Sequence, residues 1–481
     1  MLALVNTNEI VPAIAPIGLD YTACAARAAG EDVDIIDLCL ADEPDAALGD
    51  YFARNNPELI GLSFRNVDDC FWPSGAWFVP TLADTVKRIR ELSEAPIVIG
   101  GVGFSIFAEE IVAFTGADFG IRGDGEQAVL SLLEQLRGAK RFEQVPGLVW
   151  QANGKIYSNR PSWPRPLSLP TSRDAIDNAA YFKRGGQCSL ETKRGCDRQC
   201  IYCADPLSKG SVVRLREPGE VADEAETLLK QGIDVLHLCD SEFNIPLGHA
   251  RAVCEEFNRR GLGGSLRWYT YMAVTPFDNE LAESMRRAGC VGIDFTGDSG
   301  SELMLSTYRQ PHLAEDLAHA CKLCRANDIK VMIDLLLGGP GETRETVAET
   351  VGFIKKIGPD CAGAALGIRI YPNTEMARIV AAEGPPQQNV NLRRKYEGPI
   401  DFFKPTFYIS EALGVRAAEV VKEVIGGDKR FFEPMSDMAG EAAEGAACRD
   451  HNYNENIELV EAIDRGARGA YWDILHRLRC G

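Results

Sequence analysis

Strand-like and helix-like patterns of apolar and polar residues alternate along the first 137 residues. After each short apolar run, the apolar positions recur every three or four residues, as on one face of a helix. The expected strands are Leu2–Asn6, Val33–Leu40, Leu59–Phe64, Pro96–Gly100 and Ala117–Ile121. The expected helices are Asp20–Ala29, Pro44–Asn55, Pro80–Leu92, Ala108–Phe114 and Gln127–Leu136. This alternation predicts a doubly wound parallel sheet, whose ligands bind beyond the carboxyl ends of its strands.

A second alternating region begins at Cys188. Helix-like stretches such as Pro218–Gln231 and Thr343–Ile357 follow its strands. The expected strands are Ser189–Lys193, Val235–Cys239, Arg267–Ala273, Val291–Phe295, Lys330–Leu337 and Ala365–Ile370. Six such units predict a partial (βα)6 barrel of the TIM type, with its site at the carboxyl ends of the strands.

The two patterns predict an α/β protein with four parts. Residues 1–137 form the doubly wound domain, and residues 188–384 form the partial barrel. Residues 138–187 are irregular and rich in proline, which is typical of a linker. The periodicity is lost after about residue 385, so we expect residues 385–481 to form a small, mostly helical C-terminal region that lines a substrate pocket.

Composition limits the possible partners and the compartment. The chain of 481 residues is 45% hydrophobic and 25% charged, as in globular proteins of more than one domain. Its net charge of −19 argues against nucleic-acid binding, which needs a basic surface. No apolar run is long enough to cross a membrane, and the first residues lack the basic start of a signal peptide. Fifteen cysteines then favour a reducing cytoplasm.

The most specific motif is the run Cys196, Cys200 and Cys203, spaced C-x3-C-x2-C after the first strand of the barrel. Three thiolates on one loop can hold three irons of a [4Fe–4S] cluster, and the fourth iron is then open to a substrate or cofactor. The alternative is a structural zinc site, but zinc wants four ligands and no further Cys or His follows nearby. A second pair, Cys321 and Cys324, falls within an expected helix and is interpreted as packing.

The cysteine loop resembles that of the radical S-adenosylmethionine (SAM) superfamily, in which the amino and carboxylate groups of SAM bind the open iron. The resemblance implies a [4Fe–4S] cluster on the three cysteines, with SAM beside it. Tyr202, directly before the last cysteine, is included among the cofactor contacts.

Polar segments after two later strands are similar to SAM-binding segments of the family. Asp240 and Glu242 follow the second strand, where family members bind the amino group of SAM. The Gly-Gly-Glu of many members is absent here, and a solvated acidic turn is the alternative. Asp298 and Ser299 follow the fourth strand and resemble the segment near the carboxylate and ribose of SAM.

The ends of the last two barrel strands supply further candidates. Gly338 and Gly339 belong to a turn that resembles the family's Gly-Pro-Gly-Glu turn, where small residues let the backbone approach adenine. A Gly/Pro turn that leads into a helix is also ordinary structural chemistry. Arg369 and Tyr371 come at the end of the sixth strand and are candidates to line the active site as catalytic residues.

The N-terminal domain resembles the cobalamin-binding domain that is joined to many radical SAM enzymes. The resemblance rests on the alternation and on two glycine-rich segments, residues 99–105 and 123–126. Glycines at a strand end would let the backbone lie against the nucleotide tail of cobalamin. The candidate contacts are Gly100, Gly101, Ser105, Gly123 and Glu126.

Many such domains also supply a histidine as the lower ligand of cobalt. None of the six histidines here precedes His237, so either cobalamin is bound without such a ligand or the domain binds none. Arg65 ends the third strand and is the candidate for the vacated space. A guanidinium keeps its proton and cannot ligate, but a fixed cation would disfavour a fifth donor and make a methyl–cobalt species more electrophilic. The alternative is a salt bridge from Arg65 to Asp68 or Asp69.

These resemblances imply a cobalamin-dependent radical SAM enzyme that methylates a carbon atom of a small molecule. One SAM would remethylate cobalamin, and another would give a deoxyadenosyl radical unless the target is a nucleophilic aromatic carbon. The missing histidine is compatible with a subgroup that methylates indole carbon. One alternative is a radical SAM cyclase or rearrangement enzyme without methyl transfer. The other is an iron–sulfur redox or sensing protein.

Two partners follow from this prediction. The cluster needs an electron donor such as flavodoxin or ferredoxin. The substrate pocket is expected where the C-terminal region meets the barrel mouth, with Asn452–Asn456, Tyr471 and Trp472 as candidates for its lining. Trp472 could equally be a core residue of the last helix.

Overall fold

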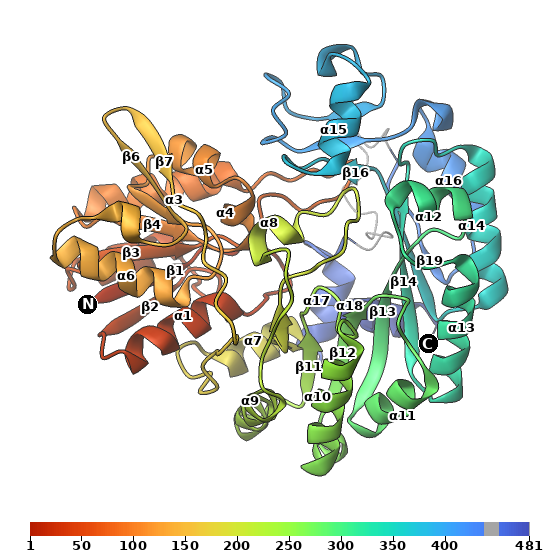
Figure 1. The fold of residues 1–481 in the computed structure, drawn as a ribbon, viewed down its shortest axis with the longest axis horizontal. Helices are drawn as coiled ribbons and strands as arrows, with labels where there is room; N and C mark the ends of the chain where they lie inside the picture. Colours follow the sequence, from red (N-terminus) through yellow and green to blue (C-terminus); the bar gives the residue numbers. More distant parts are fainter. Residues whose placement is uncertain (437–451, 481) are drawn as a thin grey trace.

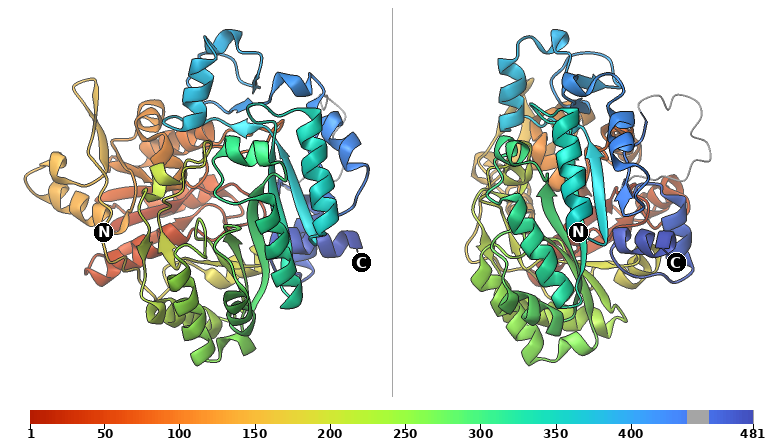
Figure 2. Two further views of the ribbon diagram at one scale, coloured as in Figure 1. Left: turned by 45° about the vertical axis from the view of Figure 1, so that its right-hand side comes forward. Right: turned by 90° about the vertical axis from the view of Figure 1, so that its right-hand side faces the viewer.

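The computed structural model of the protein describes residues 1–436 and 452–480. Two α/β bodies lie side by side in Figure 1, with the N-terminal domain in red to orange and the barrel in green to teal. Segments of the C-terminal region, in blue, lie against the barrel in both views of Figure 2. No described helix is both long and apolar enough to cross a membrane.

The N-terminal sheet has the strand order β2-β1-β3-β4-β5-β6-β7. Its first five strands are parallel, and the order reverses between β1 and β3, where open α/β sheets bind their ligands. The parallel strands are β1 Leu2–Asn6, β2 Val33–Asp37, β3 Leu59–Ser63, β4 Ile97–Gly100 and β5 Phe119–Ile121. The helices are α1 Ile17–Ala28, α2 Pro44–Phe52, α3 Val79–Leu92, α4 Val102–Ile106, α5 Ala108–Thr115 and α6 Glu126–Arg137.

The predicted linker contains more regular structure than its prolines suggest. The strands β6 (Leu148–Ala152) and β7 (Lys155–Ser158) form a hairpin that pairs antiparallel with β5 and extends the N-terminal sheet. Residues 148–158 are therefore part of this sheet rather than irregular linker. Pro161, Pro164, Pro166 and Pro170 follow this hairpin, whereas Pro146 precedes it, and α7 (Asn178–Gly185) then leads into the barrel.

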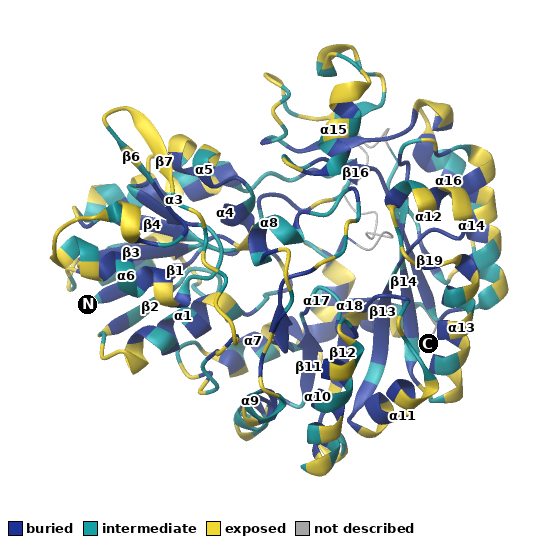
Figure 3. Ribbon diagram, viewed as in Figure 1, coloured by how far each residue is buried: buried dark blue, intermediate teal, exposed yellow. Residues whose placement is uncertain are grey.

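The barrel is a seven-stranded parallel sheet that does not close. Its strands, in order across the sheet, are β19 Phe431–Phe432, β15 Cys361–Leu366, β14 Lys330–Leu337, β13 Cys290–Asp298, β12 Arg267–Met272, β11 Val235–Leu238 and β8 Cys188–Leu190. The main helices are α9 Pro218–Lys230, α10 Leu247–Arg259, α11 Asn279–Arg287, α12 Glu302–Tyr308, α13 Ala314–Ala326, α14 Arg344–Ile357 and α16 Ala417–Ile425. They cover the outer face, so the sheet is buried and the helices expose their outward sides (Figure 3).

The sixth strand ends earlier than its sequence pattern suggests. β15 stops at Leu366, because Gly367 adopts φ +93°, a left-handed value that breaks an extended strand. The chain then enters a small separate sheet of β16 (Ile368–Arg369), β18 (Thr406–Tyr408) and β17 (Leu392–Arg394). The predicted strand over 365–370 is therefore wrong in its bounds, and Arg369 does not lie at the end of a barrel strand.

The C-terminal region covers the inner face of the barrel near the start of its strands. The helices α17 (Ile457–Asp464) and α18 (Tyr471–Cys480) pack there, and Trp472 contacts the ring of Tyr269 edge-on. A further small helix is α15 (Glu375–Ala382). The region is mostly helical, as predicted, and it also supplies the short strands β17 and β18 and the edge strand β19.

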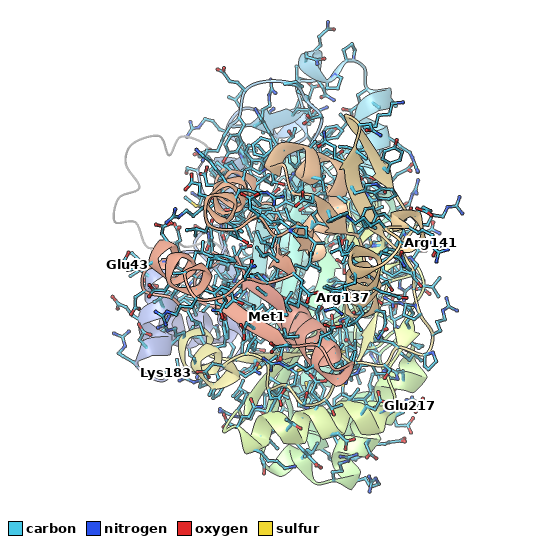
Figure 4. All side chains as sticks on the ribbon, turned by 90° about the vertical axis from the view of Figure 1, so that its left-hand side faces the viewer. Met1, Glu43, Arg137, Arg141, Lys183 and Glu217 are labelled. Carbon is cyan, nitrogen blue, oxygen red and sulfur yellow. The ribbon has the colours of Figure 1, made fainter. Side chains whose placement is uncertain are left out.

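The outward face of the N-terminal domain carries exposed ion pairs. Arg137, labelled near Met1 in Figure 4, pairs with Glu31 and Glu58. Exposed pairs of this kind contribute little to stability, because solvent screens them.

Candidate functional site

The cysteine loop is held between the barrel and the N-terminal domain. It follows β9 (Lys193–Arg194), which pairs with β10 (Arg214–Leu215), and it ends at α8 (Asp205–Lys209). The backbone N–H of Cys196 donates to the carbonyl of Gly210 at 3.1 Å, which ties the start of the loop to its end.

The three thiols of the loop lie close enough to influence one another. Burial and then neighbouring charges raise the pKa of Cys200 to about 12, and the charges of Cys196 and Cys200 contribute to the raised pKa of Cys203. The side chain of Gln310 donates to the sulfur of Cys200 at 3.4 Å. Among the described residues, no three Cys, His, Asp or Glu side chains converge as ligands of one ion. In a cluster each thiolate binds a separate iron, so these residues fit that group.

Asp240 and Glu242 differ in the partners that they already have. Asp240 is buried and accepts from the backbone N–H groups of Thr192 and Lys193 at 2.8 and 3.2 Å, and from the Thr192 hydroxyl at 2.5 Å. Its carboxylate is therefore committed to holding the strand end before the cysteine loop. The structure does not favour the predicted contact of Asp240 with SAM.

Glu242 keeps one carboxylate oxygen free. Its Oε1 accepts from the Thr296 hydroxyl at 2.9 Å, while its Oε2 has no hydrogen-bond partner among the described residues. Burial raises the pKa of Glu242 to about 7. Of the two acidic candidates, Glu242 is the one with an unused oxygen.

Asp298 and Tyr202 form a pair beside the cysteine loop. The Tyr202 hydroxyl lies 2.9 and 2.7 Å from the two carboxylate oxygens of Asp298, and Gln310 donates to Asp298 as well. Burial raises the pKa of Asp298 to about 6. Ser299 is fully buried and bonds to Thr350 at 2.7 Å, so its hydroxyl is used inside the fold and is not placed to contact a cofactor.

The turn after β14 needs glycine for reasons internal to the protein. A Cβ on Gly339 would lie 2.4 Å from the ring of Tyr308, and Gly338 adopts φ +93°. The backbone N–H of Gly339 donates to the Tyr308 hydroxyl at 3.2 Å, and Glu342 accepts from Thr346 at 2.6 Å. These contacts support the structural interpretation of the turn and leave its predicted role near adenine untested.

A cavity of about 950 Å³, which we call the glycine cavity, opens at the carboxyl ends of β1, β3, β4 and β5. The predicted contacts Gly100, Gly101, Ser105, Gly123 and Glu126 all line it. Apolar side chains form much of the rest of its wall, namely Leu4, Leu62, Val98, Ile121 and Val129. On its far side it is closed by Glu191, Arg194, Ser208 and Lys209, which flank the cysteine loop.

Two of these contacts have additional structural roles. Gly101 adopts φ +116°, and a Cβ there would lie 2.4 Å from the carbonyl oxygen of Phe64, so its glycine is required by the loop after β3. Ser105 joins the two glycine-rich segments, because it donates to the Gly101 carbonyl at 2.8 Å and accepts from the Gly123 N–H at 3.0 Å. The backbone of this wall is thus fixed before any ligand enters.

Glu126 is paired across the domain boundary. Arg194, two residues before Cys196, contacts Glu126 at 2.9 Å, Asp124 at 3.3 Å and Glu191 at 2.8 Å. The carboxylate of Glu126 therefore connects the cavity wall to the cysteine loop. This ion-pair group was not foreseen, since nothing in the local sequence marks residues so far apart as partners.

Arg65 lies at the end of β3 without an ion-pair partner among the described residues. Its guanidinium donates to the side chain of the neighbouring Asn66 at 2.8 Å. Neither alternative partner holds it, because Asp68 pairs with Arg369 at 2.9 Å and Asp69 bonds to Ser74 and Asn452. Arg65 instead lines a second cavity between the domains.

We call this second space, of about 1030 Å³, the aromatic cavity. It is assembled from the loop after β3, the inner face of the barrel and the C-terminal region. Of the C-terminal candidates, five line it, namely Asn452, Tyr453, Asn454, Tyr471 and Trp472, although Trp472 is also a core residue. Glu455 and Asn456 do not line it. The barrel contributes His237, Cys239, Tyr271 and Asp294. Sequence reasoning missed Asp294, although an acid in the middle of an apolar strand was the available signal.

Arg369 and Tyr371 lie outside the glycine cavity and the aromatic cavity. Both are held in a cluster with the loop after β3, in which Arg369 pairs with Asp68 and the Tyr371 hydroxyl lies 2.9 Å from the sulfur of Cys70. The Arg369 guanidinium also stacks 4.7 Å above the Tyr371 ring. Neither residue lines the two cavities. Their predicted catalytic role is therefore not supported, and the reason is the early end of β15.

Family models match both halves of the chain. The B12 binding domain matches residues 4–133, and the Radical SAM superfamily matches residues 190–354. A tryptophan 2-C-methyltransferase from Streptomyces laurentii is 30% identical over 98% of this chain and 95% of its own length. A cytidylyl-2-hydroxyethylphosphonate methyltransferase from Streptomyces wedmorensis is 26% identical, with 87% and 88% of the two chains covered.

A solved structure agrees over the whole chain. The radical SAM methyltransferase TsrM from Kitasatospora setae, with tryptophan and a SAM analogue bound, superposes with a TM-score of 0.91 at 28% identity and covers 99% of this chain and 97% of its own. The same enzyme with cobalamin and a [4Fe–4S] cluster gives a TM-score of 0.88 at 27% identity, covering 99% and 97% of the two chains. The predicted fold class is thereby confirmed.

Proposed function

This chain belongs to the cobalamin-dependent radical SAM methyltransferases, and we propose that the carbon atom it methylates lies on an aromatic amino acid of the tryptophan type. The family assignment gives the reaction class, a small-molecule substrate and three cofactors, namely a [4Fe–4S] cluster, SAM and cobalamin. The observation that carries the finer proposal is the aromatic cavity, which is lined by tyrosine and tryptophan rings. The relatives reported above that match nearly the whole chain are methyltransferases, which disfavours a cyclase or an iron–sulfur sensor.

In this proposal the cluster is held by Cys196, Cys200 and Cys203. Glu242 takes the amino group of SAM with its free oxygen, since a carboxylate is a strong acceptor for the N–H groups of an amine. Asp240 acts indirectly, because it fixes the strand end before the cysteine loop. Asp298 and Tyr202 remain candidates for polar contacts of SAM beside the cluster.

The glycine cavity is proposed to hold the nucleotide tail of cobalamin, and the corrin ring would lie over Arg65, at the side of the aromatic cavity that the N-terminal domain forms. Cobalamin supplies methyl transfer from SAM to the substrate carbon when it is bound. Arg65 would then face the lower side of cobalt as a cation that cannot ligate. Its lack of an ion-pair partner among the described residues supports this placement.

We further propose that a reduced flavodoxin or ferredoxin in the cytoplasm supplies the electrons. The cluster needs a low-potential donor for any reductive step. The described cysteines, from Cys24 to Cys361, are free thiols, which suits a reducing compartment.

The proposed function is tested with anaerobically reconstituted enzyme, SAM labelled with deuterium in its methyl group, and L-tryptophan. We expect a product that carries the intact labelled methyl group on a ring carbon, identified by mass and by NMR. Cleavage of SAM with no labelled product from tryptophan or other aromatic amino acids would contradict the proposed substrate. Transfer of the label to a nitrogen or oxygen atom would contradict carbon methylation.

A further inference from the structure

The inner face of the barrel changes from apolar to polar along its strands. Near the strand starts it is apolar and packs against α18, where Tyr269 and Met332 meet Trp472. Further along, the strand register sets Tyr271 beside Asp294, because these residues pair between β12 and β13. Asp294 therefore begins a polar layer directly beyond the apolar one.

Asp294 is a buried carboxyl group without a partner. It is 5% exposed, lines the aromatic cavity and makes no hydrogen bond or ion pair with the described residues. Buried polar groups in native proteins are nearly always hydrogen-bonded, so each exception calls for a reason. Leaving such a group unpaired costs free energy, and a ligand that supplies the missing donor would remove that cost.

The charges around Asp294 do not compensate for its burial. Burial is the largest cause of the raised pKa of Asp294. The charges of Asp334 on β14 and Glu242 after β11 raise this pKa further. His237 on β11 is neutral near pH 7, because burial lowers its pKa to about 4. Arg65 and Asp69 face the same cavity from the N-terminal domain, and Asp69 also has its pKa raised by burial. Among the described residues that line this cavity, two acidic side chains, Asp69 and Asp294, accompany one permanent cation, Arg65.

The surroundings distinguish between an organic and an inorganic cation. Calcium or magnesium would need several oxygen ligands around one point, and no three acidic or histidine side chains of the described residues converge in that way. Aromatic rings favour an ammonium group, because their faces attract organic cations. Tyr271 pairs with Asp294 in the sheet, and Tyr453, Tyr471 and Trp472 line the same cavity.

We propose that Asp294, flanked by Tyr271 and Tyr453, is the subsite that receives the protonated amino group of the substrate. The inference rests on the proposed function, which makes the substrate an aromatic amino acid, and it assigns one end of that substrate to one residue. The ring would then lie among the aromatic side chains toward the loop after β3. Asp294 is a substrate-binding residue in this account.

A pH dependence follows from the same contact. The raised pKa keeps the free Asp294 carboxyl protonated up to higher pH than an exposed one, and only its ionised form pairs with an ammonium. Amine binding therefore releases a proton, so affinity for an amine rises as pH increases through the carboxyl titration. A ligand of the same shape without an amine does not show this rise.

The test compares three ligands on the holoenzyme by anaerobic calorimetry: L-tryptophan, tryptamine, and indole-3-propionate, which lacks the amine. We expect Asp294→Asn to weaken tryptophan and tryptamine at least tenfold and indole-3-propionate less than twofold. Asp328→Asn, at a position whose side chain is 90% exposed, is the matched control and should change none of the three. Iron and corrinoid contents verify that each variant is intact.

Several outcomes would overturn the inference. These are equal weakening of all three ligands, no weakening by Asp294→Asn, or failure of both amines to bind the wild-type holoenzyme. If Asp294→Asn does not fold, the wild-type protein decides: an affinity for tryptamine that does not rise with pH relative to indole-3-propionate contradicts the proposal. Binding that passes these tests while no labelled methyl group is transferred would contradict the proposed function and leave the subsite standing.

Discussion

The glycine cavity and the aromatic cavity are built on opposite principles. The glycine cavity has a wall of strand ends and apolar side chains, and its charged groups are already paired with one another, as Glu126 is with Arg194. The aromatic cavity is assembled from distant parts of the chain and contains two ionisable groups that have no ion-pair partner among the described residues, Arg65 and Asp294. The first is suited to hold a group by shape, and the second is suited to act on one. Unpaired charge is thus the better guide to chemistry in this fold.

The largest effect on this comparison is expected from removing the ligands of the cluster. Replacing Cys196, Cys200 and Cys203 together by alanine should abolish the [4Fe–4S] absorbance and all SAM-dependent turnover, because no iron ligand remains on the loop. Corrinoid retention should largely survive, since the glycine cavity belongs to the other domain. Iron and corrinoid assays on the same sample check both results.

The control for this variant is the second cysteine pair. Cys321 and Cys324 lie on the buried face of α13, and their exposed fractions are 2% and 0%. Their joint replacement by alanine should lower stability and leave the iron content of the folded protein unchanged. Cluster-level iron in the triple variant would mean that the ligands lie elsewhere.

The glycine cavity, the other side of the comparison, is tested by a substitution at Gly101. Gly101→Ala should reduce corrinoid retention to background while iron is kept, because the new Cβ would collide with the Phe64 carbonyl and displace the loop that carries Arg65. Gly49→Ala is the matched control, since its Cβ would have no neighbour within 4 Å. Normal corrinoid binding by Gly101→Ala would show that this strand end does not form the cobalamin site.

A smaller effect is expected at Glu242. Glu242→Gln should weaken SAM binding by about 1.5–3 kcal/mol, the usual value for a hydrogen bond to a charged group. Asp240→Asn should instead lower the stability of the cysteine loop, because an amide NH2 in place of Oδ2 cannot accept from the Thr192 hydroxyl or pair with the Lys193 ammonium at 3.4 Å. Equilibrium dialysis with labelled SAM separates the two. Equal SAM affinity in wild type and Glu242→Gln would remove this side chain from the site.

The smallest effect concerns stability and pH. Burial raises the pKa of Glu342 from 4.5 to about 7. Between these values the unfolded chain loses a proton that the folded protein keeps, so the free energy of unfolding falls as pH rises from about 4.5 to 7, by at most about 3 kcal/mol. Glu342→Gln should flatten the fall, and Glu345→Gln, at the exposed start of the same helix, should not. Melting temperatures of the apoprotein from pH 5 to 8 measure this, and parallel curves would contradict it.

The sequence predicts the elements well where a strand is followed directly by its helix. β1 and β14 have the predicted bounds, because continuous apolar runs end at clear polar or glycine residues. The hairpin β6–β7 was missed because its second strand is exposed along its whole length and has no apolar pattern. β15 was misplaced because Ala362 to Ala365 give a weak strand signal and Gly367 interrupts the chain.

For the site, local motifs were informative and long-range pairing was not. The cysteine loop and the glycine-rich segments are each contiguous in sequence, so spacing alone points to them. The partners of Arg65 and Arg369 depend on which domain surfaces meet. The choice of Asp68 by Arg369 rather than by Arg65 follows from packing between residues about 300 positions apart, which no local pattern encodes.

The central claim is that cobalamin is bound beside Arg65 with no protein ligand on cobalt. Paramagnetic resonance of the cob(II)alamin form of the anaerobically purified enzyme tests it most directly. The account predicts a corrinoid signal without nitrogen hyperfine splitting from a lower axial ligand, since no histidine precedes His237. Arg65→His should introduce that splitting and slow methyl transfer. Nitrogen splitting in the wild-type enzyme, or a protein that retains no corrinoid at all, would contradict the claim.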